Sequence, residues 1–324
     1  MSALAYFCNS SQIRRVSQQI YRSMSSLTYA SSRTLAQWPQ LAISASEDDA
    51  EIRTKYRPFL LPEDVNRSDW TSQLELEKVA ALSSADLQAT GKRLRVLVLY
   101  GSLRTRSYSK LMAYEASRVL HRLGCDVRVF NPSTLPIRDS VPATHPSVVE
   151  LRGLSEWSDG HIWVSPEQHG NLTAVFKNQI DWIPLSTGSI RPTQGRTLSV
   201  IQVNGGSQSF NALNSLRILG RWMRMFTICN QSSLPSAYKA FEDEGGNGDG
   251  SARLLPSSNR ERLVDCMEEF VKFTIVMRPH FELFGDRFSE RTEKRDKVEK
   301  AERVAREADE KAAVENSRDI VDRI

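Results

Sequence analysis

The chain has 324 residues, of which 25% are charged and 40% hydrophobic, and it carries a net charge of +4. These values are ordinary for a chain that folds around an apolar core. Its basic residues are scattered, and no segment reaches the roughly eighteen uninterrupted apolar residues of a membrane span. The composition therefore favours neither nucleic acid nor a membrane as a partner.

The four cysteines, Cys8, Cys125, Cys229 and Cys266, lie far apart and form no CxxC pair. This spacing favours a reducing compartment and argues against a disulfide scaffold or a structural zinc site. We therefore expect no metal ligands.

The two ends of the chain differ from the middle. Residues 1–46 contain no Asp or Glu, but they contain four arginines and eleven serines. An acid-free, Arg-rich and Ser-rich start is typical of an organellar transit peptide, and an unstructured extension is the alternative. We expect a cytoplasmic protein, or a mitochondrial one if this segment is a transit peptide. Residues 291–324 alternate in charge with few large apolar residues, which predicts a solvated helix or a disordered tail.

Between these ends, apolar β-branched runs alternate with amphipathic segments. Strands are predicted at 93–101, 125–132, 161–166, 196–206 and 227–231, and helices at 107–124, 145–160, 171–185, 209–226 and 259–281. Strands that alternate with helices indicate a parallel sheet covered on both faces. The prediction is a doubly wound α/β domain, with the order of its strands left open.

Three of the predicted strands are followed by small polar residues. "GSLRTRSYS" follows the first strand, "SPEQHGNLT" the third and "NGGSQSFN" the fourth. Because ligands of doubly wound sheets bind beyond the carboxyl ends of the strands, we expect these three loops to form one site.

The first of these loops suits a phosphate group. A helix N-terminus offers free N–H groups, to which Ser102, Ser107 and Ser109 add hydroxyls and Arg104 adds a charge. The loop lacks both GxGxxG and the P-loop GK[ST]. A phosphomonoester such as that of FMN fits it better than a bridging pyrophosphate, and an ordinary surface turn is the alternative.

The segments "GSLRTRSYSKL", "SPEQHGNLTAVFKNQIDWIPLS", "RPTQGRTLSVIQVNGGSQSFNALNSLRILGRWMRMFTICNQSS" and "SERTEK" resemble the arsenical-resistance flavoproteins of the ArsH type. The resemblance extends over about residues 56–292, and we take 56–290 as one domain. It implies a flavodoxin-like fold, bound FMN, NADPH as donor and a homotetramer. It also implies electron transfer to quinones, azo compounds, metal ions, oxygen or trivalent organoarsenicals.

The resemblance also implies which residues hold FMN. The phosphate would lie against Ser102, Arg104, Ser107, Tyr108 and Ser109, and the rest of the flavin against Ser165, Glu167, His169, Gly170, Asn171, Thr173, Gly205, Gly206, Ser207 and Gln208. Asp181 is a further candidate, although its spacing from Lys177 also fits an intrahelical ion pair. Hydride transfer at the flavin needs no general acid or base, so no catalytic side chain is expected.

Three further expectations concern side chains outside this set. Arsenic capture requires clustered thiolates, and the separated cysteines argue against it. His121 is expected on a helix surface. The large residues of "DWIPLSTGSIRPTQG" and "RWMRMF" predict a subunit interface beside the flavin.

An electron carrier or redox sensor without NADPH turnover is the alternative function.

Overall fold

The computed structural model describes residues 41–62, 65–66, 69–184, 192–243, 252–285 and 287–321. Its helices are α2 (Ala50–Tyr56), α4 (Glu77–Thr90), α5 (Tyr108–Arg122), α6 (Pro146–Trp157), α7 (Ala174–Trp182), α8 (Asn211–Trp222), α9 (Ser258–Met277) and α10 (Phe288–Val321). Its strands are β1 (Arg95–Tyr100), β2 (Asp126–Val129), β3 (Gly160–Gln168), β4 (Asn171–Leu172), β5 (Thr197–Val203), β6 (Phe226–Thr227) and β7 (Ser232–Leu234).

The strands form one sheet in the order β2-β1-β3-β5-β6, and β7 also pairs with β5. These pairings are all parallel, whereas the short β4 pairs antiparallel with β3. If the short β4 is left out and β6 and β7 are counted as one interrupted strand, the order is the 2-1-3-4-5 of flavodoxin-like sheets. The predicted doubly wound, five-stranded parallel sheet is confirmed.

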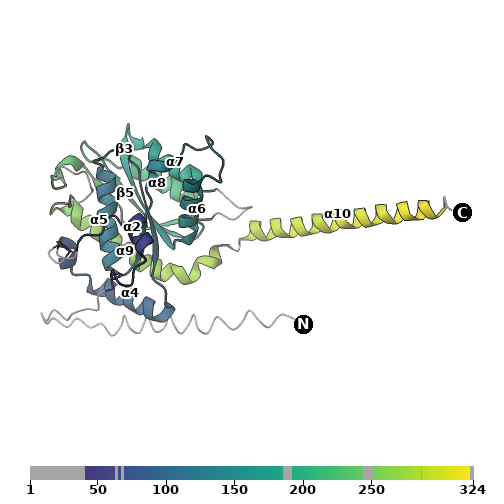
Figure 1. The fold of residues 1–324 in the computed structure, drawn as a ribbon, viewed down its shortest axis with the longest axis horizontal. Coiled ribbons are helices and arrows are strands. Elements are labelled where there is room, and N and C mark those ends of the chain that lie inside the picture. The colour runs from purple at the N-terminus through teal and green to yellow at the C-terminus, as the bar shows by residue number, and fades with distance from the viewer. Residues whose placement is uncertain are drawn as a thin grey trace.

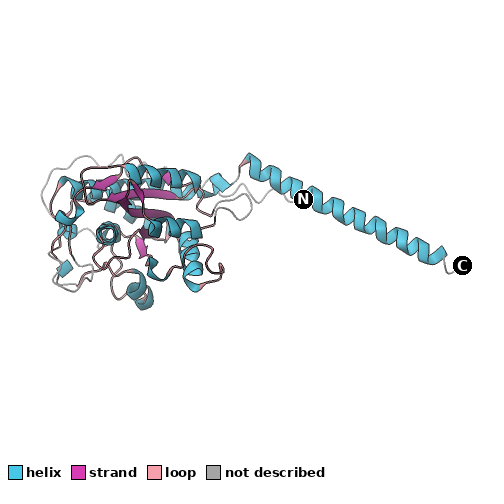
Figure 2. Ribbon diagram, turned by 90° about the horizontal axis from the view of Figure 1, so that it is seen from above, coloured by secondary structure: helices cyan, strands magenta, loops and turns pink. Residues whose placement is uncertain are grey.

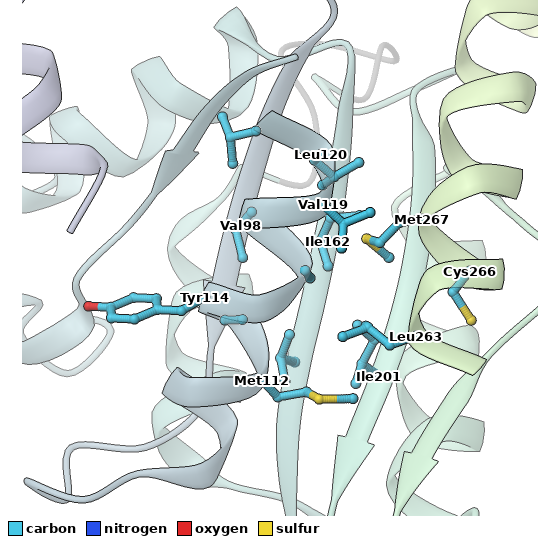
Figure 3. Packing of buried hydrophobic residues seen from close by; sticks show 14 of the residues in the cluster. Val98, Met112, Tyr114, Val119, Leu120, Ile162, Ile201, Leu263, Cys266 and Met267 are labelled. Carbon is cyan, nitrogen blue, oxygen red and sulfur yellow. The ribbon is translucent and has the colours of Figure 1, made fainter. Parts of the chain in front are cut away.

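Helices cover both faces of the sheet (Figure 1). Alternate residues of β1 point to opposite sides, so Val96 and Val98 pack in one core cluster and Leu97 and Leu99 in the other. The first cluster contains α5 and α9, with Met112, Val119 and Met267 against Ile162 and Ile201 of the sheet (Figure 3). The second cluster includes residues of α6, α7 and α8. Each strand is therefore buried on both sides, which explains the continuous apolar runs in the sequence.

Gly160 begins β3, although the sequence predicted it as the end of a helix. The helix α6 ends at Trp157, and Ser158 N donates to Leu154 O at 3.2 Å as its cap. A Cβ at Gly160 would lie 2.7 Å from Cζ of Phe270 and would also collide with Thr197. A close approach of α9 to the sheet, and not a helix stop, requires the glycine.

The fifth strand is interrupted where the sequence predicted a continuous strand at 227–231. Arg217 on α8 donates to the carbonyls of Ile228 and Cys229 at 3.0 and 2.9 Å. From α9, the Glu269 carboxylate accepts from the N–H groups of Cys229 and Asn230 at 2.8 and 3.1 Å. These side chains take the backbone groups that a strand ladder would use, so the chain forms β6 and β7 with a loop between them.

The N-terminal residues that the structure describes pack on the domain. Arg93 Nη1 donates to Leu41 O at 2.5 Å, and a Cβ at Gly124 would lie 3.1 Å from the Leu41 side chain. The predicted extension of 1–46 therefore ends inside a segment that contacts the domain, and its residues 1–40 lie outside the described residues. The helices α2 and α4 are absent from the sequence prediction.

The helix α10 leaves the domain and extends away from it (Figures 1 and 2). Its first turn is anchored by Glu290, a buried carboxylate that accepts from Gln194 Nε2 at 3.3 Å. Residues 293–310 are all exposed. Nowhere in the described ranges is there a helix with the length and apolarity of a membrane span.

The prediction for His121 is wrong. The side chain is only 8% exposed on α5 and lies edge-on to Phe59, with ring centroids 6.0 Å apart. Burial, and after it the charge of Arg57, lowers the pKa of His121 to about 4. The side chain is covered because residues N-terminal to β1, such as Phe59, pack over α5, and the sequence prediction contained no element there.

Candidate functional site

The candidate site lies at the carboxyl edge of the sheet, where β1, β3 and β5 end at Tyr100, Gln168 and Val203. The loops after β1 and β3 are in direct contact, because Thr173 Oγ1 donates to Gly101 O at 2.6 Å. A Cβ at Gly101 would lie 2.8 Å from both Thr173 Oγ1 and Phe176 Cβ. The glycine therefore allows these two loops to meet.

The hydroxyl-rich loop after β1 leads into the first turn of α5. Ser107 is the N-cap of this helix, and its Oγ accepts from Lys110 N at 3.1 Å and lies 3.1 Å from Ser109 Oγ. Ser102 Oγ accepts from Arg104 N at 3.3 Å. The amides of Tyr108 and Ser109 open the helix and have no partner within it. Ser107 and Ser109 are thus brought together at the helix N-terminus, and Ser102 lies in the loop that leads to it.

The two arginines of this loop differ in their surroundings. Arg104 is exposed, and within the described part of the chain its guanidinium has no hydrogen-bond or ion-pair partner. Arg106 donates to Glu242 O at 2.8 Å, and its guanidinium lies 5.6 Å from the centre of the Tyr108 ring. Arg104 is therefore the cation that an incoming anion can engage, whereas Arg106 already holds the 241–243 segment.

His169 and Gly170 form the tip of a tight hairpin between β3 and β4. Their φ angles are 50° and 70°, and Gln168 pairs with Asn171 across the turn. Two consecutive residues at positive φ define a type I′ turn, which suits a two-residue hairpin. The turn holds the His169 side chain in an exposed position at the edge of the sheet.

Glu167 joins the end of β3 to the loop after β5. One of its oxygens, Oε2, accepts from Gln202 Nε2 and from Ser209 Oγ, both at 2.6 Å. Ser209 O in turn accepts from Ser233 Oγ at 2.6 Å. The loops predicted from the third and fourth strands are thus tied together through one carboxylate.

The loop after β5 presents its glycines to open space. A Cβ at Gly205 or at Gly206 would meet no atom within 4 Å, and Ser207 and Gln208 are exposed. The loop is fixed from behind, because Gly206 O accepts from Ser236 N at 2.9 Å and Asn204 N donates to Leu234 O at 3.0 Å. The missing side chains leave room for a flat ligand to approach the backbone.

Two further predicted residues, Ser165 and Asp181, also have partners inside the protein. Ser165 is fully buried and its hydroxyl donates to Pro166 O at 2.9 Å. Asp181 accepts from Lys177 Nζ at 2.6 Å, which is the intrahelical ion pair given as the alternative.

Sequence reasoning missed Gln202, Asn204, Ser233 and Ser236, which hold the loops at this edge. The signal for Gln202 is visible in retrospect. It is a single amide inside the apolar run "SVIQV", a position where a strand buried on both faces normally takes an apolar side chain.

The described thiols do not gather at this edge. Burial raises the pKa values of Cys125 and Cys266 to about 12, so neither is a thiolate near neutral pH. Cys229 is exposed in the loop between β6 and β7. Across the ranges that the structure describes, no three His, Cys, Asp or Glu side chains are placed to hold a metal ion.

A 2-1-3-4-5 parallel sheet with hydroxyl-rich loops at its carboxyl edge defines the flavodoxin-like class of nucleotide-binding proteins. Residues 94–239 match the family model of the NADPH-dependent FMN reductases. Two bacterial relatives are each named NADPH-dependent FMN reductase ArsH. The one from Rhizobium meliloti is 57% identical over 68% of this chain and 88% of its own length. The one from Acidithiobacillus ferrooxidans is 53% identical over 68% of this chain and 89% of its own.

The chain belongs to the ArsH family of NADPH-dependent FMN reductases, which are oxidoreductases. Among solved structures, the apo form of the NADH:FMN oxidoreductase EmoB aligns with a TM-score of 0.45 and 16% identity, over 55% of this chain and 88% of that one. The flavoenzyme FerB from Paracoccus denitrificans aligns with a TM-score of 0.44 and 21% identity, over 55% and 97% of the two chains.

Proposed function

We propose that the protein binds FMN at the carboxyl edge of its sheet and uses NADPH to reduce small-molecule acceptors. Quinones, azo compounds, metal ions and oxygen are the acceptor classes, and trivalent organoarsenicals would be a substrate for oxidation, with oxygen as the acceptor of their two electrons. The observation that carries the proposal is the pair of contacts that join the three loops: Thr173 Oγ1 to Gly101 O at 2.6 Å, and Ser209 Oγ to Glu167 Oε2 at 2.6 Å.

The residues at this edge fit a flavin mononucleotide. The phosphate would be held by Ser102, Ser107, the amides of Tyr108 and Ser109, and the unpaired guanidinium of Arg104. The ribityl chain and the ring would lie against Glu167, His169, Gly170, Asn171 and Thr173 on one side and the open 205–208 backbone on the other. Ser165 would contact the flavin only through its backbone, because its side chain is buried. Asp181 would contribute only to the surface of α7, because its carboxylate is paired with Lys177.

Bound FMN supplies hydride acceptance from NADPH and onward electron transfer. The protein's own residues orient the reactants and shield the ring from water on the protein side. No side chain at this edge is required to move a proton. For organoarsenicals, the separated and largely buried thiols support reaction at the flavin and not capture by sulfur.

We further propose a homotetramer. Met223 and Met225 of "RWMRMF" are buried in the core, but Trp222 is 57% exposed. It shares one face of α8 with Ile218, and Phe210 is the N-cap that precedes the helix; both are also exposed. This apolar stripe begins beside Ser209 of the site, which supports a contact with a second copy that borders the flavin. Residues 185–191 of the other predicted interface segment lie outside the described residues.

The anaerobic absorbance spectrum of the purified protein tests the proposal. Flavin bands that bleach when NADPH is added support a reductase. Flavin bands that persist indicate an electron carrier or redox sensor, and a colourless protein that takes up no added FMN contradicts the proposal. Turnover with each acceptor class then identifies the substrate.

A further inference from the structure

Gln202 lies in the middle of the carboxyl edge with every polar atom of its amide engaged. It is fully buried on β5. Its Nε2 donates to Glu167 Oε2 at 2.6 Å and to Ser209 O at 3.1 Å, and its Oε1 accepts from Leu213 N at 3.0 Å. A single side chain thus connects the end of β3, the loop after β5 and the first turn of α8.

Folding alone does not require an amide here. The neighbours Val200, Ile201 and Val203 are apolar and buried, and an apolar side chain would satisfy the core at this position. A buried amide is costly unless all its hydrogen bonds are made, and a fully satisfied one imposes a single orientation on its partners. We therefore interpret the amide as a group that fixes the loops relative to one another.

The carboxylate held by Gln202 has one oxygen left. Glu167 Oε2 accepts from both Gln202 and Ser209, whereas Oε1 has no partner among the described residues. Glu167 is partly exposed at the edge, next to the exposed loops at 169–171 and 205–208. An ionised carboxylate with a free oxygen accepts hydrogen bonds from N–H and O–H groups, and a flavin nucleotide offers both.

We propose that Gln202 is a positioning residue that fixes the Glu167 carboxylate, so that Oε1 of Glu167 accepts a hydrogen bond from the bound flavin nucleotide. This inference rests on the proposed function, because it requires FMN at the carboxyl edge. It adds a residue outside the predicted binding set and assigns Glu167 a specific role.

The test replaces the amide by an acid of the same shape. In Gln202→Glu, two carboxyl groups occupy the place of the 2.6 Å amide–carboxylate contact. Such a pair cannot be doubly ionised without repulsion, and it retains a shared proton to a higher pH than an isolated carboxyl group. While the proton is shared, an O–H replaces the N–H that Gln202 donates to Glu167, and the 3.1 Å contact with Ser209 O lacks its donor at every pH. Once it is lost, Glu167 is displaced.

We therefore expect the FMN dissociation constant of Q202E to come close to that of the parent at the acid end of a titration from about pH 5.5 to pH 9, with a small, pH-independent difference from the lost contact with Ser209 O. At the alkaline end the dissociation constant should be larger than the parent's by about tenfold to a hundredfold, which is the range for losing a charge-assisted hydrogen bond. The readout is flavin fluorescence quenching during titration with FMN. The control is the parent's own FMN affinity across the same pH range.

The swapped variant Glu167→Gln/Gln202→Glu provides the matched rescue. It contains one amide and one carboxylate, as the parent does, so its FMN affinity should again follow the parent's pH profile. A Q202E variant that binds FMN with the parent's pH profile would overturn the proposal. So would a swapped variant that retains the alkaline loss, or a failure of both variants to fold, which would make Gln202 a purely structural residue. A parent protein that binds no FMN would instead overturn the proposed function.

Discussion

Thr173 and Gly101 meet at the carboxyl edge of the sheet, where the threonine hydroxyl donates to the glycine carbonyl at 2.6 Å. The same hydroxyl accepts from Phe176 N at 3.3 Å as the N-cap of α7. One side chain thus begins a helix and fixes the phosphate loop predicted after β1. The distance between the two loops is set by this contact.

Gly101 and Gly205 differ in the space around them, so alanine substitutions at the two positions should have different effects on stability and on FMN binding. Gly101→Ala places a Cβ 2.8 Å from Phe176 Cβ, and overpacking of this kind costs about 1–3 kcal/mol. Gly205→Ala meets no atom within 4 Å, so its free energy of unfolding should match the parent's. If the flavin ring lies against this backbone, Gly205→Ala still weakens FMN binding. Urea denaturation and FMN titration of both variants separate the two effects. Parental FMN affinity in Gly205→Ala would place the ring elsewhere.

Stability should fall as the pH is lowered, because two buried histidines are held neutral. Burial lowers the pKa of His161 to about 3 and that of His121 to about 4. Each pKa is lower in the folded than in the unfolded protein, where it is about 6.5. The unfolded chain therefore takes up these protons first. The stability associated with each neutral histidine is fully present above about pH 6.5. It is lost as the pH falls, down to about pH 4 for His121 and about pH 3 for His161, by at most a few kcal/mol each.

The variant His121→Leu checks this assignment. It removes a ring whose Nε2 has no hydrogen-bond partner and a group that resists protonation. Between pH 7 and pH 5, its free energy of unfolding should change less than that of the parent. An equal or steeper pH dependence would mean that His121 does not contribute.

Much of the fold follows from periodicity, whereas the closely packed contacts do not. The runs around Val96–Tyr100 and Thr197–Val203 predict strands buried on both faces, and both are strands. The break in the fifth strand depends on Arg217 and Glu269, which are 11 or more residues away in the chain and meet it only after folding. Gly160 resembles a helix stop in sequence because the approach of Phe270 is a tertiary contact.

The sequence predicts which loops form the site, but it does not predict the contacts between them. Serines and glycines at strand ends indicate a ligand edge, and the structure brings these three loops together through Thr173 and Glu167. The network of Gln202 and Ser233 was not predictable, because each acts across strands that are neighbours only in the sheet.

The exposed apolar stripe on α8 predicts a change in assembly. Replacing Trp222 and Ile218 by serine should dissociate the proposed tetramer, because both are more than half exposed and their burial would drive association. Val276→Ser is the matched control, since Val276 is 62% exposed on α9, which covers the other face of the sheet. Light scattering at micromolar concentration measures the result. A monomeric parent would contradict the proposed assembly.

Two truncations locate the start of the domain. Removing 1–40 should leave the melting temperature and FMN affinity unchanged. Removing 1–46 also deletes Leu41, whose carbonyl accepts from Arg93, and should cost about 1 kcal/mol. If the shorter truncation already loses FMN, the N-terminal segment is part of the domain. A fluorescent fusion of residues 1–46 that stays in the cytosol would separately exclude an organellar transit peptide.

The central claim is that the loop after β1 holds the FMN phosphate, and comparing FMN with riboflavin tests it most directly. Arg104 is exposed and has no partner in the described part of the chain, whereas Arg106 is bound to Glu242 O at 2.8 Å. A charged hydrogen bond is worth about 1.5–3 kcal/mol, so Arg104→Ala should weaken FMN binding about tenfold to a hundredfold. Riboflavin lacks the phosphate, so it should bind the parent and Arg104→Ala equally weakly. Equal losses for both ligands, or a larger loss in Arg106→Ala than in Arg104→Ala, would contradict the account.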